Sequence, residues 1–130
     1  MLKSNGILRY SPKKLGEYAS PNWWLILVCD DEIGRYYRHL YHLSTYRIDQ
    51  LQRSHWKSHI SVVRNEKPLN ENEWEKHAHE TIEFQYNPEI ETNGKYFWLS
   101  VVCPQLEEIR SKLGLGNPMI PLHLTIGHHI

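Results

Sequence analysis

Leu122-His123-Leu124-Thr125-Ile126-Gly127, near the end of the chain, alternates apolar and polar side chains. Successive side chains of a β-strand point to opposite faces, so the apolar residues are predicted to face the core. His123 and Thr125 then lie side by side on the other face. The segment therefore predicts a half-buried strand that presents an imidazole next to a hydroxyl group.

The same pattern occurs once more, in Ser58-His59-Ile60-Ser61-Val62-Val63. Here His59 and Ser61 share one face of a predicted strand. Histidine titrates closest to neutral pH, so two such strands can supply a matched acid and base. For either histidine alone, a partly buried imidazole with its hydrogen bonds satisfied would be the simpler interpretation. The repetition favours a shared site.

Length, charge and cysteine content restrict the class of protein. A chain of 130 residues and 15.5 kDa predicts a single domain spanning residues 1–130. Fifteen cationic and fifteen acidic residues give zero net charge, which argues against a broad nucleic-acid or membrane surface but allows a small anionic ligand. Cys29 and Cys103 lie in apolar runs and are interpreted as buried free thiols, with a disulfide less favoured. With no apolar signal segment and no run of about 20 apolar residues, we expect a cytoplasmic protein with no membrane partner and no obligate protein partner.

Hydrophobic patterning predicts an alternation of strands and helices. The segment 23–29 is continuously apolar and predicts a strand covered on both faces. A helix over 32–44 would bury Ile33, Tyr36, Tyr37, Leu40 and Leu43 and point Arg35, Arg38, His39 and His42 outward. Residues 46–53 fit a short helix or a loop. The other predicted strands are 6–10, 56–64, 81–86, 96–103 and 122–127, and the other predicted helices are 70–80 and the segment from Pro104 to Leu113.

The two halves of the chain repeat one plan of strand, helix and motif strand. Trp24-Leu25 and Val28-Cys29 of the first half align with Trp98-Leu99 and Val102-Cys103 of the second. We therefore predict two similar lobes, one over about 22–65 and the other over about 81–130. A pseudo-twofold axis between them would bring the two histidine faces together across a cleft.

The paired tetrapeptides His59-Ile60-Ser61-Val62 and His123-Leu124-Thr125-Ile126 resemble those of the 2H phosphoesterase superfamily, which includes LigT-like and cyclic phosphodiesterase-like enzymes. The resemblance implies an α+β fold, bilobal and duplicated, in which two small antiparallel sheets form a central cleft flanked by helices. It also implies metal-independent phosphodiester chemistry without a cofactor, on nucleotide or RNA 2′,3′-cyclic phosphates or on small cyclic or linear oligonucleotides. Compact members include phage enzymes that degrade cyclic oligonucleotide defence signals, which is an alternative substrate class. The chain ends five residues after Thr125, so later family elements are missing or short.

Carried over by motif position, His59 and His123 would be the catalytic pair. Ser61 and Thr125 would contact the phosphate. One histidine would take a proton from water and the other would protonate the leaving ribose oxygen. The sequence does not tell which is the acid and which the base.

Other polar and aromatic residues are weaker candidates for substrate contact. Arg64 and Lys57 flank the first motif, and Tyr10 and Trp56 are candidate stacking residues at the rim. Tyr96 and Trp98 are further candidates for stacking, although Trp98 lies in an apolar run that favours the core. His128 and His129 invite a metal site with His123, but strand alternation separates them and no cysteine or acid completes a set, so no metal is predicted.

Two functions from other classes fit part of the pattern. A non-catalytic module would hold a nucleotide or an RNA end in the same cleft without turnover. It has no need for two titratable groups facing each other. A purely structural or interaction domain would have no nucleotide affinity at all.

Overall fold

The computed structural model describes residues 1–11, 23–54 and 56–129. Within these ranges the chain forms seven strands, two α-helices and one short 3₁₀-helix. The fold class is α+β, as predicted. In chain order the elements are β1 (Leu2–Tyr10), β2 (Trp24–Cys29), α1 (Asp31–Ser44), β3 (His59–Arg64), η1 (Glu71–Glu73), β4 (Thr81–Tyr86), β5 (Glu91–Thr92), β6 (Tyr96–Val102), α2 (Pro104–Lys112) and β7 (His123–His128).

The described strands belong to one antiparallel sheet, where the sequence predicts two small ones. Their order is β4-β1-β2-β3-β7-β6-β5, and β4 also pairs with β6, which closes six strands into a ring. The halves are joined where β3 meets β7, at Ile60 and Leu124, and where β4 meets β6. The prediction of separate sheets is corrected because backbone hydrogen bonds continue across both junctions.

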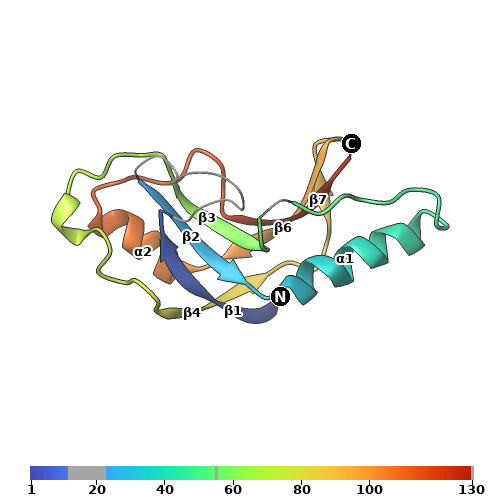
Figure 1. Ribbon diagram of the computed structural model, residues 1–130, viewed down its shortest axis with the longest axis horizontal. Coiled ribbons are helices and arrows are strands. Elements are labelled where there is room, and N and C mark those ends of the chain that lie inside the picture. Colours follow the sequence, from blue (N-terminus) through green and yellow to red (C-terminus); the bar gives the residue numbers. More distant parts are fainter. Residues whose placement is uncertain (12–22, 55, 130) are drawn as a thin grey trace.

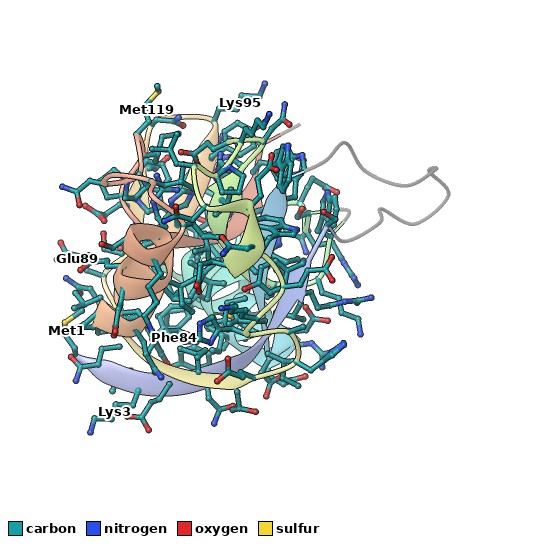
Figure 2. The ribbon with its side chains drawn as sticks, turned by 90° about the vertical axis from the view of Figure 1, so that its left-hand side faces the viewer. Met1, Lys3, Phe84, Glu89, Lys95 and Met119 are labelled. Carbon is teal, nitrogen blue, oxygen red and sulfur yellow. The ribbon has the colours of Figure 1, made fainter. Side chains whose placement is uncertain are left out.

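The helices α1 and α2 lie at opposite ends of the strands (Figure 1). The core between the elements contains the side chains that alternate inward along each strand, and Leu27, Ile60, Leu99 and Leu124 are fully buried. Figure 2 shows Phe84 in the interior, where it is 1% exposed, whereas Lys3, Glu89 and Met119 project outward. The cysteines are buried free thiols, as predicted.

Both motif strands contain a β-bulge at the same place. The extra residue is Val62 in β3 and Ile126 in β7, since the residues on either side pair with consecutive residues of β2 and β6. Each lies three positions after the motif histidine, and each is 1% exposed. A bulge puts two neighbouring residues on the buried side and increases the local twist. The halves therefore share a backbone irregularity as well as a sequence pattern.

Each bulge carbonyl accepts a hydrogen bond from an arginine of the helix that belongs to the other half. Arg38 of α1 donates from Nη1 to the carbonyl of Ile126 in β7, at 2.8 Å. Arg110 of α2 donates from Nη1 to the carbonyl of Val62 in β3, also at 2.8 Å. The helices thus link the two halves crosswise.

Strand register corrects the predicted alignment of the halves by two residues. Ile26 pairs with Ser61, and Trp98 pairs with Thr125. Trp98 is therefore the counterpart of Ile26 and not of Trp24. A shift of two residues preserves the face on which a side chain lies, because the strand period is two.

Helix α1 begins close to the predicted position but buries a different face. Asp30 is its N-cap and accepts a hydrogen bond from the backbone N–H of Glu32, at 3.0 Å. Tyr37 is buried as predicted, whereas Tyr36 is 59% exposed. Arg38, expected to point outward, turns toward β7 because the bulge carbonyl offers it a partner.

Two other predicted elements differ from the structure. Residues 70–80 form only the short η1, because positive φ angles at Glu75 and His79 are incompatible with a continuing helix. Residues 46–53 form turns and an isolated bridge between Gln52 and His128. Helix α2 starts at Pro104 as predicted. Neither α-helix in the described part of the chain is long and apolar enough to cross a membrane.

Candidate active site

The two motifs meet where β3 pairs with β7. Ile60 is the register partner of Leu124, and both are fully buried. In an antiparallel pair this places His59 opposite Thr125 and Ser61 opposite His123, all on the face away from the core. Diagonal neighbours of this kind are about 7–8 Å apart, and their Cβ atoms are somewhat closer, so the two histidines lie within reach of one small ligand. Two imidazoles and two hydroxyl groups therefore form one four-cornered arrangement.

Both histidines are held by the same backbone contact. Nδ1 of His59 lies 2.7 Å from the carbonyl of Lys57, and Nδ1 of His123 lies 2.8 Å from the carbonyl of Pro121. A carbonyl only accepts, so each Nδ1 carries a proton. This fixes the tautomer and leaves each Nε2 to accept a proton or, once protonated, to donate one.

The four motif residues line one pocket of about 950 Å³, called the main pocket below. Arg64 and Trp56, both predicted as substrate contacts, line it too. The pocket is large enough for a nucleotide-sized ligand, since small-molecule sites commonly occupy about 300–1,000 Å³. Six of the eight main candidate residues from the sequence are thus brought together, and the two further stacking candidates, Tyr96 and Trp98, line the pocket as well.

Arg64 places a positive charge between the two histidines. Its Nη2 lies 3.4 Å from Nε2 of His123, so the guanidinium donates and the imidazole accepts. Burial lowers the pKa of His59, and the charges of Arg64 and His123 lower it further. Burial, and then Arg64, likewise lower the pKa of His123. Both histidines therefore favour the neutral form before an anion enters.

Each histidine also lies next to a tryptophan. The ring centroids of Trp56 and His59 are 5.8 Å apart, and those of Trp98 and His123 are 6.1 Å apart. Trp98 was expected in the core, but its half-buried ring lines the main pocket. Trp24 lines it as well, so the expectation that β2 is covered on both faces holds only in part: Ile26 on the pocket face is buried, whereas Trp24 is partly exposed. The pocket side of β2 and β6 is apolar enough to resemble a core strand in sequence.

Further polar groups at the main pocket were missed by sequence reasoning. Ser100 is the register partner of His123, and its hydroxyl donates to the carboxylate of Glu91 on β5. Asn93 also lines the pocket, as does Tyr96, which the sequence had offered as a stacking candidate. The signal that could have found Ser100 is its even spacing from Trp98 along one strand face. Glu91 and Asn93 depend on the β5–β6 pairing and had no sequence signal.

The remaining two candidates lie elsewhere. Lys57 lines a second pocket of about 90 Å³, called the side pocket below, together with Asp31, Arg35, Arg38 and Arg53. Lys57 thus flanks the motif as predicted but faces away from the main pocket.

Tyr10 is not part of the main pocket. Its ring packs edge to face on Trp74, with centroids 4.7 Å apart. β2 lies between β1 and β3, so Tyr10 is placed against the segment after η1 and is not brought together with the motif residues.

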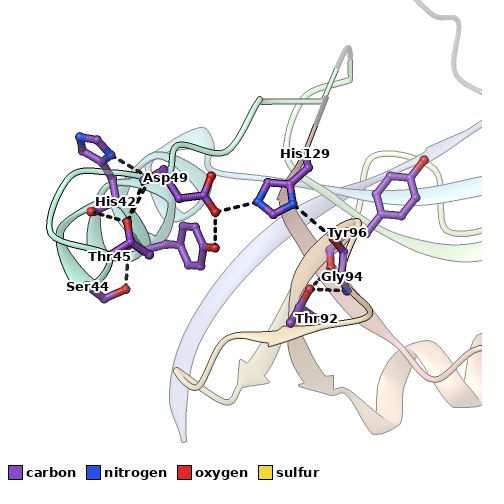
Figure 3. Close-up of polar contacts among 9 residues, drawn as sticks. His42, Ser44, Thr45, Asp49, Thr92, Gly94, Tyr96 and His129 are labelled. Carbon is purple, nitrogen blue, oxygen red and sulfur yellow. Dashed lines mark hydrogen bonds and ion pairs between the residues drawn. The ribbon is translucent and has the colours of Figure 1, made fainter.

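His129, considered for a metal site, takes part in a different polar cluster (Figure 3). Its Nε2 contacts the carboxylate of Asp49 at 2.8 Å, and its Nδ1 lies 3.2 Å from the carbonyl of Gly94. The hydroxyl of Tyr41 donates to the same carboxylate at 2.6 Å. The cluster ties the end of β7 to the segment after α1 and to the turn before β6.

Among the described residues, no group of three or more His, Cys, Asp or Glu side chains is arranged to hold a metal ion. Comparison of the chain with protein-family models, with curated proteins and with solved structures gave no match. The function is therefore argued from the geometry of the site.

Proposed function

We propose that the protein is a metal-independent phosphodiesterase that opens nucleotide or RNA 2′,3′-cyclic phosphates, or cleaves small cyclic or linear oligonucleotides. The observation that carries the proposal is the matched geometry of His59 and His123. Each imidazole is fixed at Nδ1 by a backbone carbonyl and turns toward the same pocket. A binding module would not require two titratable groups oriented alike on opposite sides of a ligand.

The reaction needs one base and one acid on opposite sides of the phosphorus atom. A water oxygen attacks phosphorus while one Nε2 accepts the water proton, and the bond from phosphorus to one ribose oxygen breaks. The other Nε2, protonated beforehand, donates its proton to that oxygen. General acid and base groups typically contribute about 10²- to 10⁴-fold each.

The neighbouring groups suit the charge of a phosphate. The hydroxyls of Ser61 and Thr125 donate to the non-bridging oxygens, and Arg64 balances the charge that develops there. An anion at this position also raises the pKa values of both histidines and so favours protonation of one. Trp56 and Trp98 offer aromatic surfaces for a base.

The contact of Arg64 with His123 divides the two roles. The guanidinium at Nε2 of His123 disfavours protonation of that nitrogen, which favours His123 as the base once Arg64 turns to the phosphate and leaves the Nε2 lone pair free. His59, for which no such hydrogen bond from Arg64 is found among the described residues, is then the acid. A diester with a p-nitrophenolate leaving group tests this assignment because that group leaves without protonation. Its cleavage is expected to be less sensitive to His59→Ala than to His123→Ala.

The proposal also includes the duplicated, two-lobed arrangement of the fold. We interpret the halves as two lobes of a duplicated fold, joined along β3 and β7, with the main pocket as the cleft between them. The equivalent bulges and the crosswise arginine contacts support this interpretation. It is the arrangement that the resemblance to 2H phosphoesterases implies.

The test is turnover of a substrate panel with EDTA present. The panel contains 2′,3′-cyclic mononucleotides, a short RNA with a cyclic phosphate end, and cyclic di- and trinucleotides. Parent protein is compared with His59→Ala, His123→Ala and, as a matched control, His39→Ala on the exposed side of α1. Loss of product in the first two variants but not in the control is the expected result.

Other outcomes have definite meanings. Absence of turnover by the folded parent on every member of the panel would contradict the proposal. Nucleotide affinity that persists in the double variant of His59 and His123, with no product from the parent, would identify a binding module. Absence of both turnover and affinity would leave a structural domain.

A further inference from the structure

The side pocket is a separate basic chamber that opens next to His59. Four residues line both pockets: Ser54, Trp56, His59 and Thr125. The two spaces therefore adjoin each other at His59 and Trp56. A ligand held at the histidines can extend from one into the other.

Cations dominate the lining of the side pocket. Arg35 and Arg38 come from α1, and Arg53 and Lys57 come from the segment before β3, whereas Asp31 is the one acidic residue of the lining. One carboxylate oxygen of Asp31 is engaged by the backbone N–H of Ser58, at 2.8 Å. The pocket thus carries a clear excess of positive charge.

Most of these cations lack a carboxylate partner. Arg35 pairs with Glu32 at 3.1 Å on the exposed surface. In the ranges 1–11, 23–54 and 56–129, no acidic side chain forms an ion pair with Arg38, Arg53 or Lys57. Burial and then the charge of Arg53 lower the pKa of Arg38, and Arg35 adds to this, whereas the charge of Asp31 acts in the opposite direction. Like charges held this close are stabilised by an anion placed among them.

The other half of the molecule shows that the fold does not require this charge. By the repeat of the helices, Arg35 corresponds to Glu107, and by the repeat of the motif strands, Lys57 corresponds to Pro121. Arg38 corresponds to Arg110, which Glu66 already neutralises. The excess of positive charge is therefore confined to the first half.

The volume of the side pocket and the guanidinium donors that line it indicate which kind of ligand it binds. At about 90 Å³ the side pocket is far smaller than the main pocket of about 950 Å³ and than common small-molecule sites of about 300–1,000 Å³, which suits a small anion and not a nucleobase. Guanidinium groups match the oxygen geometry of phosphate and form strong charge-assisted hydrogen bonds with it. We propose that the side pocket binds a second phosphate group of the substrate, one nucleotide position away from the phosphate that reacts. This inference rests on the proposed function and narrows its substrate class to compounds with at least two phosphates.

The test compares three compounds: a nucleoside 2′,3′-cyclic phosphate, its 5′-phosphorylated form, and a dinucleotide that ends in a cyclic phosphate. We expect at least one compound with a second phosphate to have a KM about tenfold below that of the first. Arg53→Gln and Arg35→Gln are expected to remove this difference. Arg9→Gln, which removes the same charge from exposed β1, is the matched control and should retain it.

The outcomes separate this inference from the proposed function. Turnover of all three compounds with equal KM, or a difference that survives both variants, would overturn the side-pocket assignment while the phosphodiesterase stands. If the parent turns over none of them and no member of the substrate panel above, the proposed function fails, and calorimetric binding of the 5′-phosphorylated compound then tests the side pocket independently of turnover. Weaker binding by Arg53→Gln but not by Arg9→Gln would then support it, and equal or absent binding would overturn it.

Discussion

Arg38 and Arg110 donate to equivalent bulge carbonyls, yet the two halves surround them differently. Arg110 is 3% exposed and is held by both carboxylate oxygens of Glu66, at 2.8 and 2.9 Å. Arg38 is partly exposed and lies among other cations at the side pocket. The first arginine completes a closed structural network, whereas the second leaves charge available for a ligand. The same backbone plan thus gives one arginine a carboxylate partner and leaves the other among cations, where we propose that a phosphate binds.

The largest expected effect separates these two arginines. Arg110→Ala leaves a carboxylate and a buried carbonyl without their partner and is expected to lower the free energy of unfolding by about 3–5 kcal/mol. Arg38→Ala removes one hydrogen bond and relieves repulsion between cations, so a loss of about 1 kcal/mol is expected. Urea denaturation measures both. Equal losses would show that the halves do not differ in this way.

Arg64 in β3 and His128 in β7 occupy equivalent positions of the two halves, so variants of the two residues can be compared at the main pocket. Arg64→Gln is expected to lower kcat/KM about 10²-fold, through loss of a donor to the phosphate. It also removes a charge that lowers the pKa values of His59 and His123, so the pH optimum should move upward. His128→Gln is the control. A pH profile that stays in place in Arg64→Gln would contradict the electrostatic role.

The residue after each bulge differs between the halves, with Val63 in β3 and Gly127 in β7. A Cβ at position 127 would lie 2.8 Å from the carbonyl oxygen of Gln52, whose backbone is bonded to His128. Gly127→Ala is therefore expected to cost roughly 1–3 kcal/mol through backbone displacement. Thermal unfolding gives the value. An unchanged Tm would mean that the Gln52 segment can move away at little cost.

The smallest effect is expected from His129, whose cluster with Asp49 has no counterpart at the end of β3. The hydrogen bond to Asp49 raises the pKa of His129, while bonds from Tyr41 and His129 lower that of Asp49. The histidine contributes stability that is present below its ordinary pKa and is lost as pH rises through its folded value. Asp49 contributes stability that is lost as pH falls through its own lowered value. His129→Gln should therefore lower Tm near pH 6 and have little effect at pH 9.

For His59 and His123 at the main pocket, protonation changes stability in the opposite direction. Their pKa values are lowered in the folded protein, so protonation favours unfolding, and they reduce stability as pH falls below the ordinary value of about 6.5. In His59→Gln and His123→Gln, the free energy of unfolding should fall less than in the parent protein as pH is lowered. Urea midpoints measured across pH 5 to 8 distinguish this behaviour from that of His129→Gln.

Local patterns were sufficient for much of this protein. Strict alternation of apolar residues around His59 and His123 predicted both motif strands, because a sheet with one buried face imposes a period of two. Pro104 and the spacing of Leu106, Ile109 and Leu113 predicted α2. The pairing of the motifs by internal repeat placed six candidate residues at one pocket.

Only the tertiary structure decided what depends on contacts between distant segments. The bulges, the crosswise arginine bonds and the side pocket all join residues more than twenty positions apart, and no local pattern encodes them. The two-residue shift that makes Trp98 the counterpart of Ile26 follows from hydrogen-bond register. A shift of two residues leaves the alternation of apolar and polar residues unchanged, so the sequence pattern does not reveal it. The strand faces at the main pocket are as apolar as those in a core. The sequence alone therefore could not distinguish a strand face that lines a pocket from one that is buried against other elements.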